Sequence, residues 1–155
     1  MRSVVTTVLL IIFTFSPTGE LASSDMPIRE QEFTHIMRTV SDAWNEGNAR
    51  KAADCFAEDA VYMEPPDRQV YVGRAAIYDF FGGPKKPEPP MHMTWHHLAF
   101  NEKEQMGFGE FTFQLNHRYH GIVTVEIRRQ KISKWREYEY QSTDDWETFA
   151  GKSKF

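Results

Sequence analysis

The C-terminal half of the chain alternates between apolar and polar residues over four stretches of ten residues each. Successive side chains of a strand point to opposite faces of a sheet, so this period of two predicts long strands with one buried face. Only short polar turns separate the stretches, which is typical of an antiparallel meander. The predicted strands cover residues 91–100, 106–115, 119–128 and 132–141.

The preceding part of the chain has the spacing of helices. From Glu32 to Gly47 the apolar residues recur at intervals of three and four, which predicts an amphipathic helix. The same reading predicts further elements in the order short helix, short strand, short strand, helix and proline-rich loop, at residues 49–56, 60–64, 70–72, 74–81 and 82–90. Helices that precede a long antiparallel sheet indicate a segregated α+β domain. A curved sheet that closes over helices forms a cone, and its interior is a natural ligand pocket.

Composition excludes several classes of protein. A chain of 155 residues supports one domain, and its 12 Phe, 6 Tyr and 4 Trp are far more aromatic residues than a disordered chain carries. The single cysteine, Cys55, excludes an internal disulfide framework and a thiolate-rich metal site. A net charge of −4 argues against a general nucleic-acid binder. An enzyme, a binding module and an assembly domain all remain open.

The first residues have the pattern of a secretory leader. Arg2 precedes twelve uncharged residues at positions 4–15, and small residues follow at Ala22 and Ser24. Twelve residues are too few to span a bilayer of roughly 30 Å, so we expect no stable membrane span. We expect residues 1–24 to be a signal peptide or a leader that does not fold, and the protein to be exported. The alternative is a cytoplasmic protein whose true start is Met26.

Two runs of the sequence resemble a known family. The run AWNEGNARKAADCFAEDAVYMEPP, followed by VGRAAIYDFF, is similar to the opening of nuclear transport factor 2-like domains, in particular their SnoaL-like (polyketide cyclase-like) branch. The resemblance covers about residues 31–151 and implies a cone-shaped, cystatin-like α+β barrel over residues 26–151. It also implies a small-molecule pocket and a homodimer formed through the open sheet face. Members that are enzymes work by acid–base chemistry without a cofactor, and others are not catalytic.

One candidate for such chemistry lies on the first strand. Tyr62 and Glu64 are two residues apart and share a face, and Glu64 matches the place of the carboxylate base in ketosteroid-isomerase-like proteins. A carboxyl group in an apolar cone has a raised pKa, which suits proton abstraction near neutral pH. The tyrosine that the resemblance requires on the first helix is missing, because Thr39 and Val40 stand there. The alternative is a solvated carboxylate at the rim.

A second candidate combines Arg118, His120 and Glu137. Arg118 and His120 share a strand face, and Glu137 lies on the neighbouring predicted strand. Limonene-epoxide-hydrolase-like enzymes place Arg, Asp and Asp at the corresponding positions, so His120 breaks that pattern while the arginine and the last carboxylate remain. A histidine and a carboxylate bridged by arginine can still move protons, as in a dehydratase or cyclase. The alternative is an internal salt bridge that holds the two strands together.

Five of the six histidines lie between residues 92 and 120. Zinc is an unfavourable interpretation, because His92 and His96 would be roughly 13 Å apart along a strand. We expect one of His96 and His97 to face the cone, and we place His96 and Trp135 beside Tyr62 and Glu64 in the pocket.

The sequence therefore predicts a pocket for a small hydrophobic hydroxy or keto compound. Arg118, His120 and Glu137 are the candidate catalytic residues for cofactor-free, metal-free acid–base chemistry of the isomerase, dehydratase, cyclase or epoxide-hydrolase type. The alternative is a non-catalytic ligand-binding or dimeric assembly domain. Nucleic acid is not an expected partner.

Overall fold

The structure is a computed structural model that describes residues 26–65, 69–85 and 91–151. The predicted leader at residues 1–24 and residues 86–90 of the predicted loop lie outside the described residues. The elements in chain order are α1 (Glu30–Asn45), α2 (Ala49–Ala53), β1 (Phe56–Glu64), β2 (Gln69–Val72), α3 (Arg74–Phe80), β3 (His92–Asn101), β4 (Met106–Gln114), β5 (Arg118–Arg128), β6 (Lys131–Gln141) and α4 (Trp146–Gly151).

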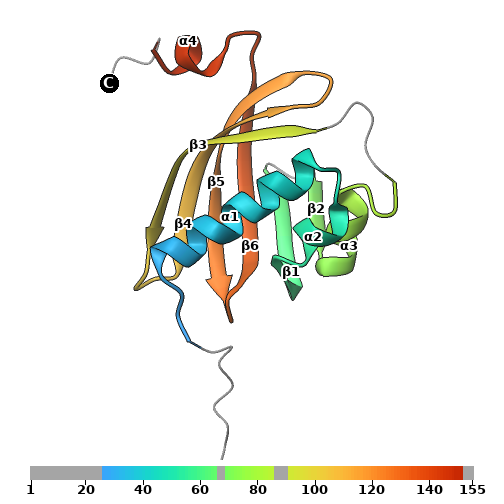
Figure 1. The fold of residues 1–155 in the computed structure, drawn as a ribbon, viewed down its shortest axis with the longest axis vertical. Coiled ribbons are helices and arrows are strands. Elements are labelled where there is room, and N and C mark those ends of the chain that lie inside the picture. Colours follow the sequence, from blue (N-terminus) through green and yellow to red (C-terminus); the bar gives the residue numbers. More distant parts are fainter. Residues whose placement is uncertain (1–25, 66–68, 86–90, 152–155) are drawn as a thin grey trace, which may run out of the picture.

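The six strands form one curved sheet that does not close on itself, with the order β2-β1-β6-β5-β4-β3 (Figure 1). Strands β3 to β6 are the predicted antiparallel meander. Strand β1 joins this meander by parallel pairing with β6 and extends it with β2, which is antiparallel to β1. The α+β cone is therefore confirmed, and the parallel junction between β1 and β6 is a feature that the sequence pattern did not predict.

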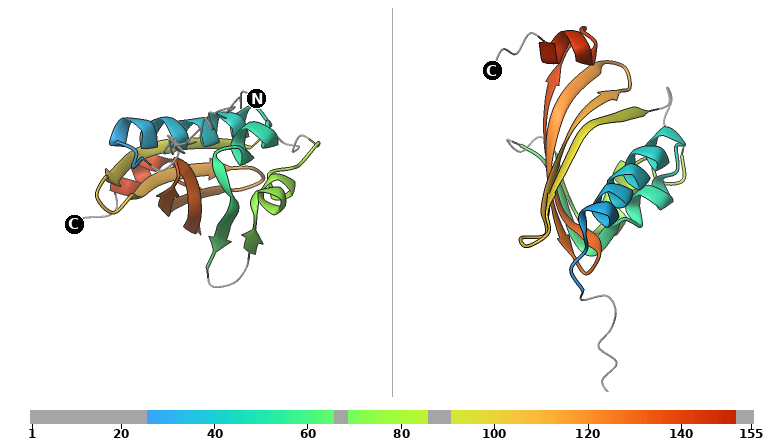
Figure 2. Two further views of the ribbon diagram at one scale, coloured as in Figure 1. Left: turned by 90° about the horizontal axis from the view of Figure 1, so that it is seen from below. Right: turned by 60° about the vertical axis from the view of Figure 1, so that its left-hand side comes forward.

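Helix α1 lies across one face of the sheet, and α2 and α3 cover the same side (Figure 2). We call this the inner face and the opposite one the outer face. The apolar side of α1 is buried as its spacing predicted, at Phe33, Met37, Val40, Ala43 and Trp44. Polar contacts fix its position on β3, because the Trp95 indole donates to the Met37 carbonyl at 3.0 Å.

Two glycines end one element and begin another. Gly47 has a φ of +67°, a left-handed conformation that ends α1, and the Asn48 side chain then caps α2 by accepting from the Lys51 amide at 3.0 Å. Gly73 has a φ of +89° directly before α3. These turns return the chain to the inner face and place the small residues of α2 against the core.

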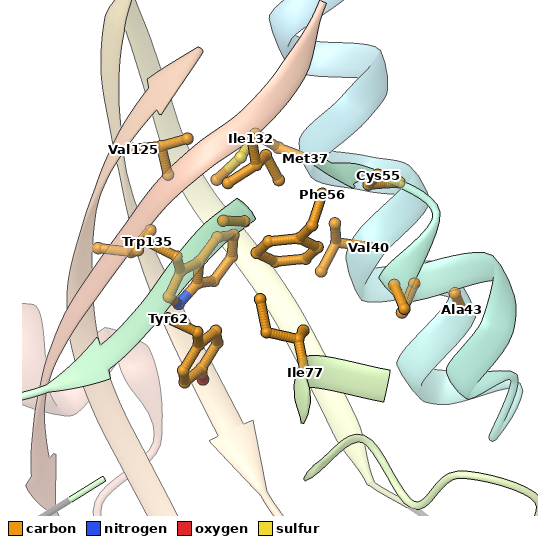
Figure 3. Close-up of a cluster of buried hydrophobic side chains, with 14 of the residues drawn as sticks. Met37, Val40, Ala43, Cys55, Phe56, Tyr62, Ile77, Val125, Ile132 and Trp135 are labelled. Atoms are coloured by element: carbon orange, nitrogen blue, oxygen red, sulfur yellow. The ribbon is translucent and has the colours of Figure 1, made fainter. Parts of the chain in front are cut away.

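The core lies between the helices and the inner face of β1 and β6, as Figure 3 shows. The Phe56 ring packs on Tyr62, Phe81 and Trp135, with centroid separations of 6.4, 5.7 and 5.9 Å. Cys55 is buried at the edge of this cluster, and burial raises the pKa of its thiol to about 11. A thiol in that state is mostly protonated and is a poor nucleophile.

The inner face of β4 carries glycines where rings approach the backbone. A Cβ atom on Gly107 would lie 2.3 Å from Cζ of Phe33, and one on Gly109 would lie 2.8 Å from Cζ3 of Trp95. Only glycine lets the rings of Phe33 and Trp95 approach the backbone of β4 this closely. Within the described part of the chain, none of the helices has the length and apolar character needed to cross a membrane.

Candidate functional site

The parallel junction between β1 and β6 brings three side chains together. In its register Tyr62 lies opposite Trp135, and their rings stack with centroids 5.8 Å apart and planes 10° from parallel. The Tyr62 hydroxyl donates to Oε1 of Glu137, and the Trp135 indole donates to Oε2 at 2.9 Å. All three residues are buried, so this carboxyl group sits in the protein interior with two neutral hydrogen-bond donors.

A cavity of about 270 Å³ opens next to this group. Its lining is mainly aromatic and apolar and includes three carboxyl groups. The lining residues are Trp44, Tyr62, Glu64, Gln69, Phe80, Phe81, Gly82, Met91, Phe113, Leu115, Glu137 and Glu139. Trp135 is not among them and instead lies behind Glu137, where its indole orients the carboxyl group.

The environment shifts the ionisation of the two carboxyl groups on β6. Burial raises the pKa of Glu137 to about 7, although the hydrogen bonds from Tyr62 and Trp135 oppose the shift. Burial raises the pKa of Glu139 to about 8, and the negative charges of Glu137 and Glu64 raise it further. Burial and the neighbouring Glu137 carboxylate hold the pKa of Tyr62 well above its usual range. Both carboxyl groups can therefore gain or lose a proton near neutral pH.

Glu64 lines the same cavity from the end of β1. Its carboxylate accepts from Nε2 of Gln69 at 2.7 Å. The Tyr71 hydroxyl in turn donates to Oε1 of Gln69 at 3.0 Å. Tyr62 and Glu64 both line this cavity, and its use as a substrate pocket stays a prediction. Their chemical roles stay predictions.

Trp44 closes the cavity from α1 and carries a polar atom without a partner. Its side chain packs against Phe81 and Phe113 and is 5% exposed. Its indole nitrogen has no hydrogen-bond acceptor among the described residues. A buried N–H without an acceptor is unfavourable, and a bound molecule with an acceptor oxygen would relieve this.

The structure does not bring Arg118 and His120 to Glu137. Glu137 lies opposite Val123 in the register of β5 and β6, whereas His120 lies opposite Tyr140. Residues three apart on a strand point to opposite faces, so His120 is on the outer face while Glu137 is on the inner one. The prediction that Arg118, His120 and Glu137 form one site is therefore wrong.

On the outer face His120 belongs to a hydrogen-bond network that includes the segment directly before α4. The Nε2 atom of His120 donates to the Asp144 carbonyl at 3.0 Å, so its Nδ1 accepts from the Thr112 hydroxyl at 2.9 Å when the ring is neutral. Thr112 then accepts from Nε2 of His96 at 2.7 Å. Arg118 lies at the edge of this network and donates to the Thr143 carbonyl at 3.2 Å.

His96 is also on the outer face, and the prediction that it lines the pocket is wrong. The register of β3 and β4 shifts between Trp95 and His97, so the strand carries an extra residue there. As a result His96 and His97 both lie beside Trp146 of α4, with His96 stacked on it at a centroid distance of 3.9 Å. Burial lowers the pKa of His96, and the neighbouring His120 and His97 lower it further.

Sequence reasoning missed Glu139 and Trp44. Glu139 had a readable signal, because it lies two residues after Glu137 on the same face of a predicted strand. Trp44 was read only as part of the apolar side of a helix, and nothing in its spacing distinguishes a core residue from a pocket residue.

Comparison with known proteins agrees with this fold. The family described as SnoaL-like domain matches residues 37–135. No curated protein matches the sequence at a significant level. Many solved structures do.

The matching structures include proteins of unknown function and enzymes. A protein of unknown function with a cystatin-like fold from Methylobium petroleophilum PM1 has a TM-score of 0.66 and 18% identity, with 84% of this chain and 95% of that chain covered. The epoxide hydrolase/cyclase-like enzyme SalBIII of salinomycin pyran-ring formation has a TM-score of 0.62 and 18% identity over 72% and 92% of the two chains. An LEH-like epoxide hydrolase of M. tuberculosis has a TM-score of 0.60 and 13% identity over 78% and 89%. At these identities the likeness shows the fold.

Proposed function

Because the chain belongs to the SnoaL-like domain family, we propose that its cavity binds a small hydrophobic hydroxy or keto compound and transfers protons on it without a cofactor. The observation that carries this proposal is the pair Glu137 and Glu139, two carboxyl groups that titrate near neutral pH in an aromatic-lined cavity. Structural neighbours that are described as an epoxide hydrolase/cyclase-like enzyme and an epoxide hydrolase support chemistry of this class.

Glu139 is the group that exchanges the proton with the bound compound. Both oxygens of Glu137 already accept hydrogen bonds, whereas the Glu139 carboxyl has no hydrogen-bond partner among the described residues. Ionised Glu139 accepts the proton α to a carbonyl group, and the protonated form returns it to carbon or to a departing hydroxyl oxygen. The Trp44 N–H donates to the carbonyl oxygen, on which negative charge develops.

Glu137 acts as a positioning residue. Its negative charge raises the pKa of Glu139, and its bonds to Tyr62 and Trp135 keep that charge at a fixed place beside the cavity. Glu137→Gln is therefore expected to move the pH–rate profile of proton transfer to lower pH, because the pKa of Glu139 falls. A purely structural role of Glu137 would leave the position of the profile unchanged.

The test is exchange of α-protons for deuterium in a panel of aromatic and alicyclic ketones, followed by NMR. We expect Glu139→Gln to slow the exchange roughly 10²- to 10⁴-fold, the usual contribution of a general base. The matched control is Glu126→Gln, the same substitution at a surface carboxylate that pairs with Lys134 at 2.8 Å. Equal exchange rates in Glu139→Gln and the unsubstituted protein would show that Glu139 does not transfer the proton.

A specific observation favours assembly as a second candidate function. The outer face exposes large apolar side chains on neighbouring strands, Phe108 at 51%, Ile122 at 39%, Tyr138 at 47% and Tyr140 at 66%. We propose that this face forms a homodimer. Sedimentation of the Ile122→Glu variant tests it, because a charge there should give a monomer if the face is an interface. An unchanged mass would exclude this face.

The export of the protein stays a proposal from the sequence. N-terminal sequencing of protein produced in its native host tests whether residues 1–24 are removed.

A further inference from the structure

The charged groups in the cavity all have one sign. Its lining includes Glu64, Glu137 and Glu139, and none of the lining residues that the structure describes is a lysine, arginine or histidine. The remaining surface is mostly aromatic. Aromatic faces attract cations because the π-system is negative at its face, and sites for organic ammonium groups combine such faces with carboxylates.

Among the residues that the structure describes, the carboxylates of the cavity have no cationic partner, whereas several carboxylates on the protein surface do. Glu58 pairs with Arg74 at 2.9 Å, and Glu126 pairs with Lys134 at 2.8 Å. In the cavity, Glu137 accepts only from the neutral Tyr62 and Trp135. Glu64 accepts from the neutral amide of Gln69, and among the described residues Glu139 has no partner. The fold thus leaves unneutralised charge where a ligand would bind.

The unpartnered indole of Trp44 is an independent sign of a ligand. This N–H is buried, belongs to a residue that lines the cavity, and has no acceptor among the described residues. An occupant that satisfies it carries an acceptor oxygen such as a carbonyl or hydroxyl group.

A metal ion does not fit this arrangement. In the described part of the chain, no group of three or more His, Cys, Asp or Glu side chains is placed to hold a metal ion. The three carboxyl groups therefore surround the space without converging on one point. A positive charge spread over an organic group, in contact with aromatic rings, matches this distribution better than a point charge.

We propose that the cavity takes a hydrophobic organic cation with an acceptor oxygen, that is, an amino ketone or an amino alcohol. This inference rests on the proposed function, since it uses the same cavity, and it narrows the class of compound. The ammonium group lies among the aromatic rings and next to Glu139, and the oxygen accepts from Trp44. At a pH above about 8, where Glu137 and Glu139 are ionised, the carboxylates repel anionic compounds.

The experiment compares two probes that differ only in charge, phenacyltrimethylammonium and neopentyl phenyl ketone. In the second, a carbon atom replaces the nitrogen, so shape and the ketone oxygen are kept. Binding is followed by calorimetry at about pH 8.5, where carboxyl groups with pKa values of about 7 and 8 are ionised. We expect the cation to bind about tenfold more tightly or better, and the preference to shrink at about pH 5.5.

Two substitutions separate the charge from the oxygen. Glu139→Gln should lower the preference for the cation about tenfold and leave the neutral ketone unchanged, whereas Glu126→Gln on the surface should change neither. Trp44→Phe should weaken both probes equally, because both carry the same ketone. Equal affinities of the two probes at about pH 8.5, binding of neither, or an unchanged preference in Glu139→Gln would overturn the inference.

Failure of this inference and failure of the proposed function give different results. Deuterium exchange in neutral ketones without any preference for the cation would overturn the inference and leave proton transfer standing. Tight binding of the cation without exchange in any ketone would overturn proton transfer and leave the inference standing.

Discussion

The outer and inner faces of the sheet carry titratable groups at neighbouring positions, because Glu139 precedes Tyr140, the residue of β6 that lies opposite His120 of β5. The surroundings of these groups differ completely. On the outer face the ring nitrogens of His120 and Nε2 of His96 are engaged with Thr112 and the Asp144 carbonyl. On the inner face Glu139 has no hydrogen-bond partner among the described residues and faces a cavity. A group whose hydrogen bonds are all satisfied within the fold holds structure together, whereas one that faces a cavity can act on a ligand.

The largest expected effect concerns the inner face and pH. The pKa of Glu137 is about 7 in the folded state and near 4.5 in the unfolded chain, so the folded state retains the proton longer. The stability that this group contributes is complete below about pH 4.5 and is lost as the pH rises through about 7. The expected loss is on the order of 3 kcal/mol in the free energy of unfolding.

Urea denaturation at a series of pH values measures this loss. Glu137→Gln should reduce the fall in stability between about pH 4.5 and pH 7, because a neutral amide of the same shape can still bond to Tyr62 and Trp135, while Glu139 keeps its own share of the pH dependence. A fall in stability between about pH 4.5 and pH 7 that is the same in Glu137→Gln and in the unsubstituted protein would contradict this prediction.

An intermediate effect is expected at Gly121, which lies opposite Glu139 in the register. A Cβ atom there would lie 2.6 Å from the Tyr138 carbonyl oxygen and 2.7 Å from Cζ of Phe111. Gly121→Ala should lower the free energy of unfolding by about 2 kcal/mol through this overlap. Gly151→Ala is the control, because open space surrounds that position. Equal stability of the two variants would show that the backbone yields without strain.

The smallest effect is expected for the outer network. His120→Ala removes the bonds to Thr112 and Asp144 and the contact with Phe149, and should cost about 1–2 kcal/mol. The exposed His117 gives a matched control as His117→Ala. The rate of α-proton exchange in ketones, per folded molecule, should be the same in the unsubstituted protein, His120→Ala and His117→Ala. A loss of exchange in His120→Ala would mean that the outer face takes part in the chemistry.

The face on which each residue lies was predictable within a strand. The alternation of β6 already places Trp135, Glu137 and Glu139 together, and the spacing in α1 gives its buried side. Such patterns are local, because strand and helix geometry fix them.

The relation between strands was not predictable. The turn between β5 and β6 uses Arg129 and Gln130 with positive φ angles of 50° and 61°, at positions where Asn-Gly would have signalled the turn type. Without that signal the register, and with it the separation of His120 from Glu137, could not be read. The β-bulge at His96 likewise could not be predicted from the residues around it.

The junction of β1 with β6 also has a consequence for the order in which the protein is made. Tyr62 and Glu137 are 75 residues apart in the chain, and they meet only through this pairing. A ribosome releases α1, α2, α3 and β1 long before it releases β6, so β1 can pair with β6 only late in synthesis. Contacts between such distant segments form slowly. The complete cavity therefore cannot form before β6 has been made, and a chain truncated before β6 has the aromatic side of the cavity without Glu137 and Glu139.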